Sequence, residues 1–323
     1  MVGIKNLNQE RIVLMISILI LIAASVGLSG FLNSANLISI VRSISVLGVL
    51  ALGMAIVIIG RGIDLSMVAI MAMSVAWYLN LLGLGYSDYT ALTLVILGVL
   101  AVGGLNGFLV AYADVPPIFV TLASGLFVFG YVRSQLITSD AVTVPPGHWL
   151  ESLGQFRAVS IPADIFIFAG LCLASFLFLR FTKWGRYVYF AGDNPVAARI
   201  AGIPVRPMLV LRYVLSALFS FIAGLLTAAS LLSINTRVVN SNLLYDVVLV
   251  TVIGGIGLSG GKGGVRNVLI GAIMIGILLN AMTIAGISLL FQNLIKAVIL
   301  LLAIIFDGMV NPRDEQTTQQ GDL

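Results

Sequence analysis

The sequence contains little charge and few side chains that could do chemistry. Only 9% of its 323 residues are charged and 60% are hydrophobic, whereas an average soluble domain has about 25% charged residues. This balance excludes an ordinary water-soluble protein. The single cysteine, Cys172, excludes an intramolecular disulfide and a cysteine metal cluster, and we interpret it as a packing residue. The single histidine, His148, offers no histidine metal site, so we expect no metal and no catalytic residue.

Positive charge is present but scattered. The formal net charge is +4, and the 17 Lys and Arg stand singly between apolar runs. They form no basic stripe and no patch interleaved with aromatic residues, which a nucleic-acid-binding surface would show. We therefore expect no nucleic-acid partner, and we interpret the positive balance as a signal of membrane topology.

Long apolar runs dominate the chain. A transmembrane helix needs roughly 20 apolar residues, and runs of this kind occur at about residues 12–32, 43–60, 67–83, 90–112, 118–137, 161–182, 208–234, 243–259, 267–287 and 289–308. The first run is longer than the core of a cleavable signal peptide, so we expect it to be retained. Continuous runs favour helices over barrel strands. The predicted fold class is all-α, a polytopic transmembrane helical bundle of about ten spans that forms a single domain over residues 1–323.

The distribution of basic residues predicts the topology. A cytoplasmic N-terminus places all but five of the 17 Lys and Arg on the cytoplasmic side. The five exceptions are Arg42, Arg133, Arg157, Arg237 and Lys296. An even number of spans makes both residues 1–11 and residues 310–323 cytoplasmic. Two connections are long enough to carry structure, an external one at residues 138–160 and a cytoplasmic one at residues 183–207.

Two glycine-rich patterns resemble nucleotide-binding motifs, but their contexts exclude that function. Residues 255–260 match GxGxxG, yet they follow an apolar run and have Asn280 in place of an acid about 20 residues later. Lys262 lacks both the glycine and the following Ser or Thr of a phosphate-binding loop. The chain therefore supplies no ATP site. We interpret this segment as a tight turn between two spans.

The segment GRGIDLS, residues 60–66, allows two interpretations. In the first, Gly62 ends one helix in the left-handed conformation, while Asp64 or Ser66 caps the next helix. In the second, the segment is a reentrant break that lines a transport path. The pattern G-I-x-L-S recurs at residues 255–259, which is too short to establish an internal duplication.

The predicted spans contain neutral polar groups rather than central charges. An ionised side chain costs at least about 2.5 kcal/mol at the centre of a spanning helix, and the acids near the spans fall at span ends: Asp64, Asp164, Asp246 and Asp307. Neutral groups could bind an uncharged polyhydroxyl solute or could join helices. The candidate path residues are Gly62, Asp64, Asn80, Asn106, Thr227, Ser230, Asn280 and Gln292. Gly103 and Gly107 form a GxxxG pattern, which is typical of close helix packing.

The connection at residues 183–207 contains the signals of a short helix. Asn194 suits the N-cap, Pro195 the first helical position, and Gly202 the residue beyond the helix end. These signals leave about two turns, and a helix that short is unstable alone in water. It is either a local surface helix or a rigid knob for a cytoplasmic partner.

Four blocks occur in order along the chain: GRGIDLS, LNGFLVAYADVPPIFVTL, WGRYVYFAGDNPVAARIAGIPV and VIGGIGLSGGKGGVRNVLIGA. They resemble the GGIDLS, LNGxL…VPPFIVTL, GRxxYAIGGNxxAARLxGI and IGGxSLSGGxGxxxGxxxGA motifs of the permease subunits of ATP-binding-cassette importers of the ribose, galactose and xylose type, a family that also serves branched-chain amino acids. The resemblance covers most of the chain. Arg61 departs from the first motif, which has glycine there, and Asn267 departs from the last, which usually has a small residue.

The resemblance implies a type II importer-like fold and a non-catalytic subunit in a bacterial inner membrane. It implies as partners separate ATPase subunits, which bind the ATP and magnesium, an external solute-binding protein, and a second permease copy, identical or different. Residues 194–203 would be the coupling helix, with ATPase contacts at Asn194, Pro195, Ala197, Ala198, Arg199, Gly202 and Ile203. The external loop at residues 138–160 would help to dock the binding protein. A bulky charged residue at position 198 should then uncouple transport without preventing insertion.

The predicted function is the permease subunit of an ATP-driven importer for a small polar solute, most simply a monosaccharide such as ribose. A branched-chain amino acid, a nucleoside or an autoinducer-like sugar derivative is an alternative solute within the family. Two other classes stay open. A secondary transporter would need coupling-ion ligands deep in the bundle, and a passive channel or scaffold would show no dependence on nucleotide.

Overall fold

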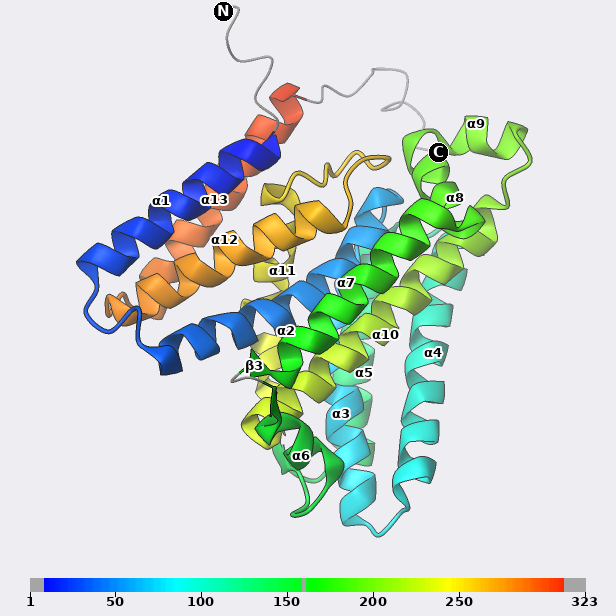
Figure 1. Cartoon of the computed structure of the whole chain (residues 1–323). Helices are drawn as coiled ribbons and strands as arrows, with labels where there is room; N and C mark the ends of the chain where they lie inside the picture. The colour runs from blue at the N-terminus through cyan, green and yellow to red at the C-terminus, as the bar shows by residue number, and fades with distance from the viewer. Residues whose placement is uncertain (1–8, 159–160, 311–323) are drawn as a thin grey trace, which may run out of the picture.

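The computed structural model describes residues 9–158 and 161–310, which form a helical bundle with two very small sheets (Figure 1). Apolar helices lie at all ten predicted spans: α1 (Gln9–Gly27), α2 (Ser34–Ile59), α3 (Met67–Gly83), α4 (Asp88–Tyr112), α5 (Pro117–Tyr131), α7 (Ala163–Phe181), α10 (Val205–Leu231), α11 (Leu243–Ile253), α12 (Val265–Ile284) and α13 (Leu289–Val310). In the described ranges, seven segments are long and apolar enough to cross a membrane, and Met67–Gly83, Leu243–Ile253 and Leu289–Ile305 are shorter apolar helices. The predicted polytopic bundle is confirmed.

Helix α11 is shorter than its predicted span. It ends at Ile253, not near residue 259, because Gly255 takes the left-handed conformation, with a φ of +95°, and the chain from Gly254 also packs closely against α12. A Cβ atom on Gly254 would lie 2.2 Å from the carbonyl oxygen of Asn267. The 11 residues of α11 rise only about 16 Å, which is less than the roughly 30 Å of hydrocarbon that a full span crosses.

The start of α2 also differs from its predicted position. The helix begins at Ser34, not near residue 43. The side chain of Asn33 accepts a hydrogen bond from the amide of Ala35 at 3.1 Å, which caps the helix. The first two predicted spans are therefore separated by a short turn at residues 28–33.

Helices α2 and α10 form the centre of the bundle. The part of α2 from Leu47 to Ile59 is buried throughout, and α10 packs against α2, α3 and α4. Glycines on α4 allow a close approach to α10. A Cβ atom on Gly107 would lie 2.5 Å from Cα of Val210, and one on Gly103 would lie 2.8 Å from the carbonyl oxygen of Tyr213. The GxxxG pattern therefore joins α4 to α10 within this chain, as its packing interpretation predicts.

The outer helices carry exposed apolar side chains. Helices α1, α5, α7 and α13 present residues such as Leu19, Phe127, Leu173 and Leu302 on the surface of the bundle. Apolar surface of this extent is unusual on a soluble monomer. In a bilayer the lipid chains cover it.

The two ends of the bundle have different structures. The start of α1 and the end of α13 lie at the same end as α8 (Lys183–Asp193) and α9 (Pro195–Ile200), which we call the loop end (Figure 1). The opposite end, the strand end, carries α6 (Trp149–Gln155), a π-helical turn, Val132–Leu136, and a 3-10 turn, Thr236–Asn240. Here β1 (Ala141–Thr143) pairs with β4 (Ser233–Asn235), and β2 (Arg157–Ala158) pairs with β3 (Ile161–Pro162), both antiparallel.

Candidate functional site

Helix α9 is a short helix capped by the residues that its sequence predicts. The side chain of Asn194 accepts the amides of Val196 and Ala197 at 3.1 and 3.0 Å, and Pro195 occupies the first turn. Beyond the other end, Gly202 has a φ of +75°, the left-handed conformation that favours glycine. The prediction of a short helix in this connection is confirmed.

One side of α9 rests on its own chain. Ala198 is 4% exposed and packs with Ala191 of α8 and Val205 of α10. The structure therefore corrects the role of Ala198, because its methyl group faces the bundle and not a partner. The other predicted contact residues lie nearer the surface: Asn194, Ala197, Arg199 and Gly202 are exposed, and Pro195 and Ile203 are half-buried. A bulky charged residue at position 198 would first disturb the packing of α9 against α8 and α10.

The outer side of α9 carries two apolar residues that the predicted contacts missed. Val196 is 43% exposed and Ile200 is 84% exposed. Residues four positions apart lie on the same face of a helix, so the two side chains form one apolar surface on a projecting helix. The i, i+4 spacing is visible in the sequence, but the predicted contacts were taken from other residues of the loop motif.

The GRGIDLS segment forms a turn between α2 and α3 at the loop end. Its left-handed residue is Arg61, with a φ of +64°, so the prediction that Gly62 takes this conformation is wrong. Ser66 occupies the N-cap of α3 but makes no side-chain cap hydrogen bond. Asp64 instead accepts the amide of Ser66 at 2.9 Å, inside the turn.

Asp64 is buried among polar groups of neighbouring helices. Its carboxylate accepts the hydroxyl of Ser216, on α10, at 2.6 Å. Asn106, on α4, donates to the hydroxyl oxygen of Ser66 at 3.0 Å. Buried polar groups require such partners, and these contacts join the turn to α4 and α10. Gly62, Asp64 and Asn106 therefore occupy a hydrogen-bonded junction at the loop end.

A cavity of about 690 Å³ lies between α2, α10, α11 and α12. Small-molecule sites typically measure about 300–1,000 Å³. Three of the predicted path residues, Thr227, Ser230 and Asn280, lie in its wall. Further polar lining residues are Ser39, Ser43 and Thr283. The lining comes from the parts of these helices near the strand end, and helix segments far apart in the sequence bring hydroxyl and amide groups together there.

Two ion pairs border this cavity. The Nε atom of Arg42 lies 3.3 Å from the carboxylate of Asp164, and Nζ of Lys296 lies 2.7 Å from that of Asp246. Arg42 and Asp246 both belong to the cavity wall. Each of these charged wall residues already has a partner of opposite sign, so together they leave the cavity electrically balanced.

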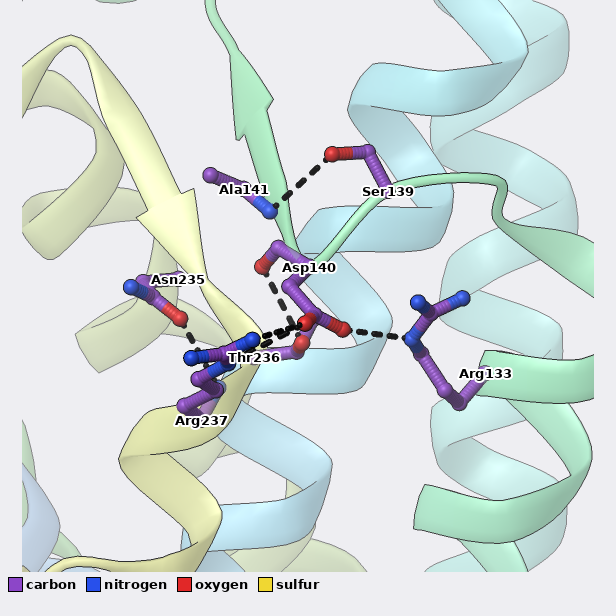
Figure 2. Close-up of polar contacts among 7 residues, drawn as sticks. All are labelled: Arg133, Ser139, Asp140, Ala141, Asn235, Thr236 and Arg237. Atoms are coloured by element: carbon purple, nitrogen blue, oxygen red, sulfur yellow. Dashed lines mark hydrogen bonds and ion pairs between the residues drawn. The ribbon is translucent and has the colours of Figure 1, made fainter.

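A third ionic cluster lies at the strand end (Figure 2). Arg133 and Arg237 bind opposite oxygens of Asp140 at 2.6 and 2.9 Å, and the hydrogen bonds from Arg133 and then from Arg237 lower the pKa of Asp140. The carbonyl of Asp140 accepts the amide and hydroxyl of Thr236 at 2.8 and 3.0 Å. Of the five basic residues outside the positive-inside pattern, four are thus ion-paired, and Arg157 donates to two backbone carbonyls.

The two remaining candidate path residues lie outside the cavity. Asn80 donates to the carbonyl of Leu136 at 2.8 Å, which holds the π-helical turn. Gln292 donates to the carbonyl of Ile287 at 2.8 Å, at the start of α13. Both side chains make the interhelical or helix-end hydrogen bonds that were the alternative to a role in transport.

The described part of the predicted docking loop, residues 138–158, is held to the bundle by aromatic and charged side chains; residues 159–160 lie outside the described residues. The Nε2 atom of His148 lies 3.2 Å from both the hydroxyl of Tyr78 and the carboxylate of Asp88. Trp149 donates to the same tyrosine hydroxyl at 3.2 Å. These contacts fix α6 against α3 and α4, so the loop presents an ordered surface at the strand end. Its docking role stays a prediction.

Comparisons with known proteins agree with this arrangement. The sequence profile of the family described as "Branched-chain amino acid transport system / permease component" matches residues 36–305. The chain belongs to this family. The permease is thus a multi-pass membrane protein, and the predicted function class, the permease subunit of an ATP-binding-cassette importer, is confirmed.

Several relatives match the permease over most of its length. "Ribose import permease protein RbsC" of Escherichia coli (strain K12) is 31% identical over 300 residues, which cover 91% of this chain and 92% of the relative. The protein of the same name from Bacillus subtilis (strain 168) is 32% identical over 293 residues, or 90% and 89%. "Fructose import permease protein FrcC" of Rhizobium meliloti is 31% identical over 314 residues, or 94% and 86%. No solved structure matches the chain.

Proposed function

We propose that this permease passes a monosaccharide across a bacterial inner membrane and is driven by separate ATPase subunits that dock on α9. The ATPases bind the ATP and magnesium, and an external binding protein delivers the sugar at the strand end to a pair of permease copies. The observation that carries the proposal is the nearly complete exposure of Ile200 on a capped helix whose opposite side is packed on the bundle.

The attachment of α9 to the bundle suits the transmission of force. A helix that moves a membrane bundle must be rigid and attached to it, and the Asn194 cap and the buried Ala198 provide both properties. Its outer apolar face would be covered by a partner in water. The basic residues near α8 and α9 support a cytoplasmic position for this end under the positive-inside rule. They are Arg180, Lys183, Arg186, Arg199 and Arg206.

The cavity favours a neutral polyhydroxyl solute. Its wall carries hydroxyl groups, whose oxygens can accept hydrogen bonds from sugar hydroxyls, whereas the amide of Asn280 is paired with that of Asn36. Its charged residues Arg42 and Asp246 are already paired, so neither is free to bind the carboxylate or ammonium group of an amino acid. The names of the relatives, ribose and fructose import permeases, point to the same solute class.

Reconstitution tests the proposal. Vesicles that contain the permease, its ATPase and its binding protein should accumulate labelled ribose or fructose only with ATP. Uptake without the ATPase would instead indicate a secondary carrier or a channel. Ile200→Ser removes the apolar contact, and Ile200→Leu retains it as a matched control.

The expected size of the Ile200 effect follows from burial. Burying an isoleucine contributes about 1.5–3 kcal/mol, so Ile200→Ser should weaken ATPase binding about ten- to a hundredfold. Binding of the detergent-solubilised subunit to the immobilised ATPase measures this effect. Equal binding by the serine and leucine variants would contradict the docking role of α9.

A further inference from the structure

Three backbone segments meet at the loop end, next to the start of α9. They are the GRGIDLS turn, the turn at residues 254–264 and the end of α8, which lie together in Figure 1. The amide of Gly261 donates to the carbonyl of Ile59 at 2.7 Å. A Cβ atom on Gly192 would lie 1.9 Å from the same carbonyl oxygen. Only backbones free of side chains can approach this closely.

The side chain of Arg61 joins these three segments. Its Nε atom donates to the carbonyl of Ser259 at 2.8 Å, and its Nη2 atom donates to the carbonyl of Asp193 at 2.6 Å. Its stem lies against Gly260, where a Cβ atom would be 2.4 Å from Cγ of the arginine. One planar cation therefore connects the turn after α2 both to the turn after α11 and to the end of α8.

The backbone of Arg61 takes a conformation that favours glycine. A φ of +64° is unfavourable for a residue with a Cβ atom and costs glycine nothing. Glycine would satisfy the turn, and it is the residue that the resembled motif has at this position. In this chain an arginine occupies the strained conformation and makes two charge-assisted hydrogen bonds, which are stronger than neutral ones.

We infer that Arg61 is a positioning residue that transmits the movement of α9 to the turns at the ends of α2 and α11. Asp193 is the last residue of α8, and the next residue, Asn194, caps α9. A cation at the carbonyl end of a helix is electrostatically favoured. A displacement of α9 therefore pulls on both turns through this side chain, in addition to the backbone contacts between the three segments. This inference rests on the proposed docking of an ATPase on α9.

Three substitutions separate transmission from simple stabilisation. Arg61→Gly removes the side chain and also relieves the backbone strain, whereas Arg61→Ala removes the side chain and keeps the strain. Arg61→Lys keeps the charge but can reach only one of the two carbonyls in the same geometry. Thermal stability should therefore be higher for the glycine variant than for the alanine variant. The ratio of sugar transported to ATP hydrolysed should fall several-fold in both and less in the lysine variant.

A second measurement does not depend on transport. A nitroxide label on Ala201→Cys reports the motion of the α9 segment in detergent, and we expect greater mobility when Arg61→Gly is added. Wild-type values for both label mobility and transport per ATP in the glycine variant would overturn the inference. If the unmodified permease shows no ATP-driven uptake, the proposed function fails, whereas unchanged label mobility in Arg61→Gly counts against Arg61 alone.

Discussion

Replacing Gly107 by alanine tests the contact between α4 and α10. The new Cβ atom would lie 2.5 Å from Cα of Val210, whereas carbon atoms in contact normally lie about 3.5–4.0 Å apart. The two helices would have to separate by about 1 Å, and overpacking of this kind costs about 1–3 kcal/mol. The obstructing atom belongs to the backbone, so no side-chain rotation can relieve the clash.

Gly104 provides a matched control on the same helix. A Cβ atom there meets nothing within 4 Å, so Gly104→Ala gives the helix-propensity gain, up to about 1 kcal/mol, without the clash. Because both substitutions share this gain, the difference between them isolates the packing cost. We expect Gly107→Ala to be about 1–3 kcal/mol less stable than Gly104→Ala.

Unfolding of the purified permease in mixed micelles with increasing SDS measures this difference. The fraction of folded protein can be followed by tryptophan fluorescence or by circular dichroism. Adding Gly103→Ala to Gly107→Ala should lower the unfolding free energy further, because Gly103 meets the same helix. Equal unfolding free energies for the Gly107 and Gly104 variants would refute the argument that α4 and α10 are in backbone contact.

Two further predictions concern topology and pH. The native Cys172 is buried, so it should not react with a membrane-impermeant maleimide. Applied to intact cells, this reagent should label Ser152→Cys at the strand end and not Ala201→Cys. Labelling of position 201 would contradict the proposed orientation. Asp140 has a lowered pKa, so its ion pairs contribute stability above the ordinary value of 3.8 and lose it as the pH falls through the folded value. Asp140→Asn should therefore lower the melting temperature at pH 7, and the difference from the wild type should vanish in acid; a constant difference at every pH would contradict this account.

Much of the fold could be predicted from the sequence. The apolar runs locate the ten helices because a span requires an uninterrupted stretch of apolar residues. The caps of α9 could also be predicted, because Asn194, Pro195 and Gly202 act through local backbone geometry. Features of this kind depend only on neighbouring residues, so the packing of the rest of the bundle does not alter them.

The features that the sequence did not predict depend on tertiary contacts. Ala198 and Ile200 lie two residues apart, and only the packing of α9 on α8 and α10 decides which of them is buried. The same holds for the path candidates, since the rotation of each helix places Thr227 in the cavity wall and directs Asn80 to a carbonyl. The left-handed conformation of Arg61 ran against the strong preference of that conformation for glycine.

The exposure of Ile200 also bears on how the cell handles this subunit. A protruding apolar surface in the aqueous phase is what chaperones and quality-control proteases recognise on incomplete assemblies. A permease made without its motor subunit would keep that surface uncovered after correct insertion. Its lifetime in the membrane would then follow the supply of its partner, and the abundance of the two chains would be matched by degradation as well as by synthesis.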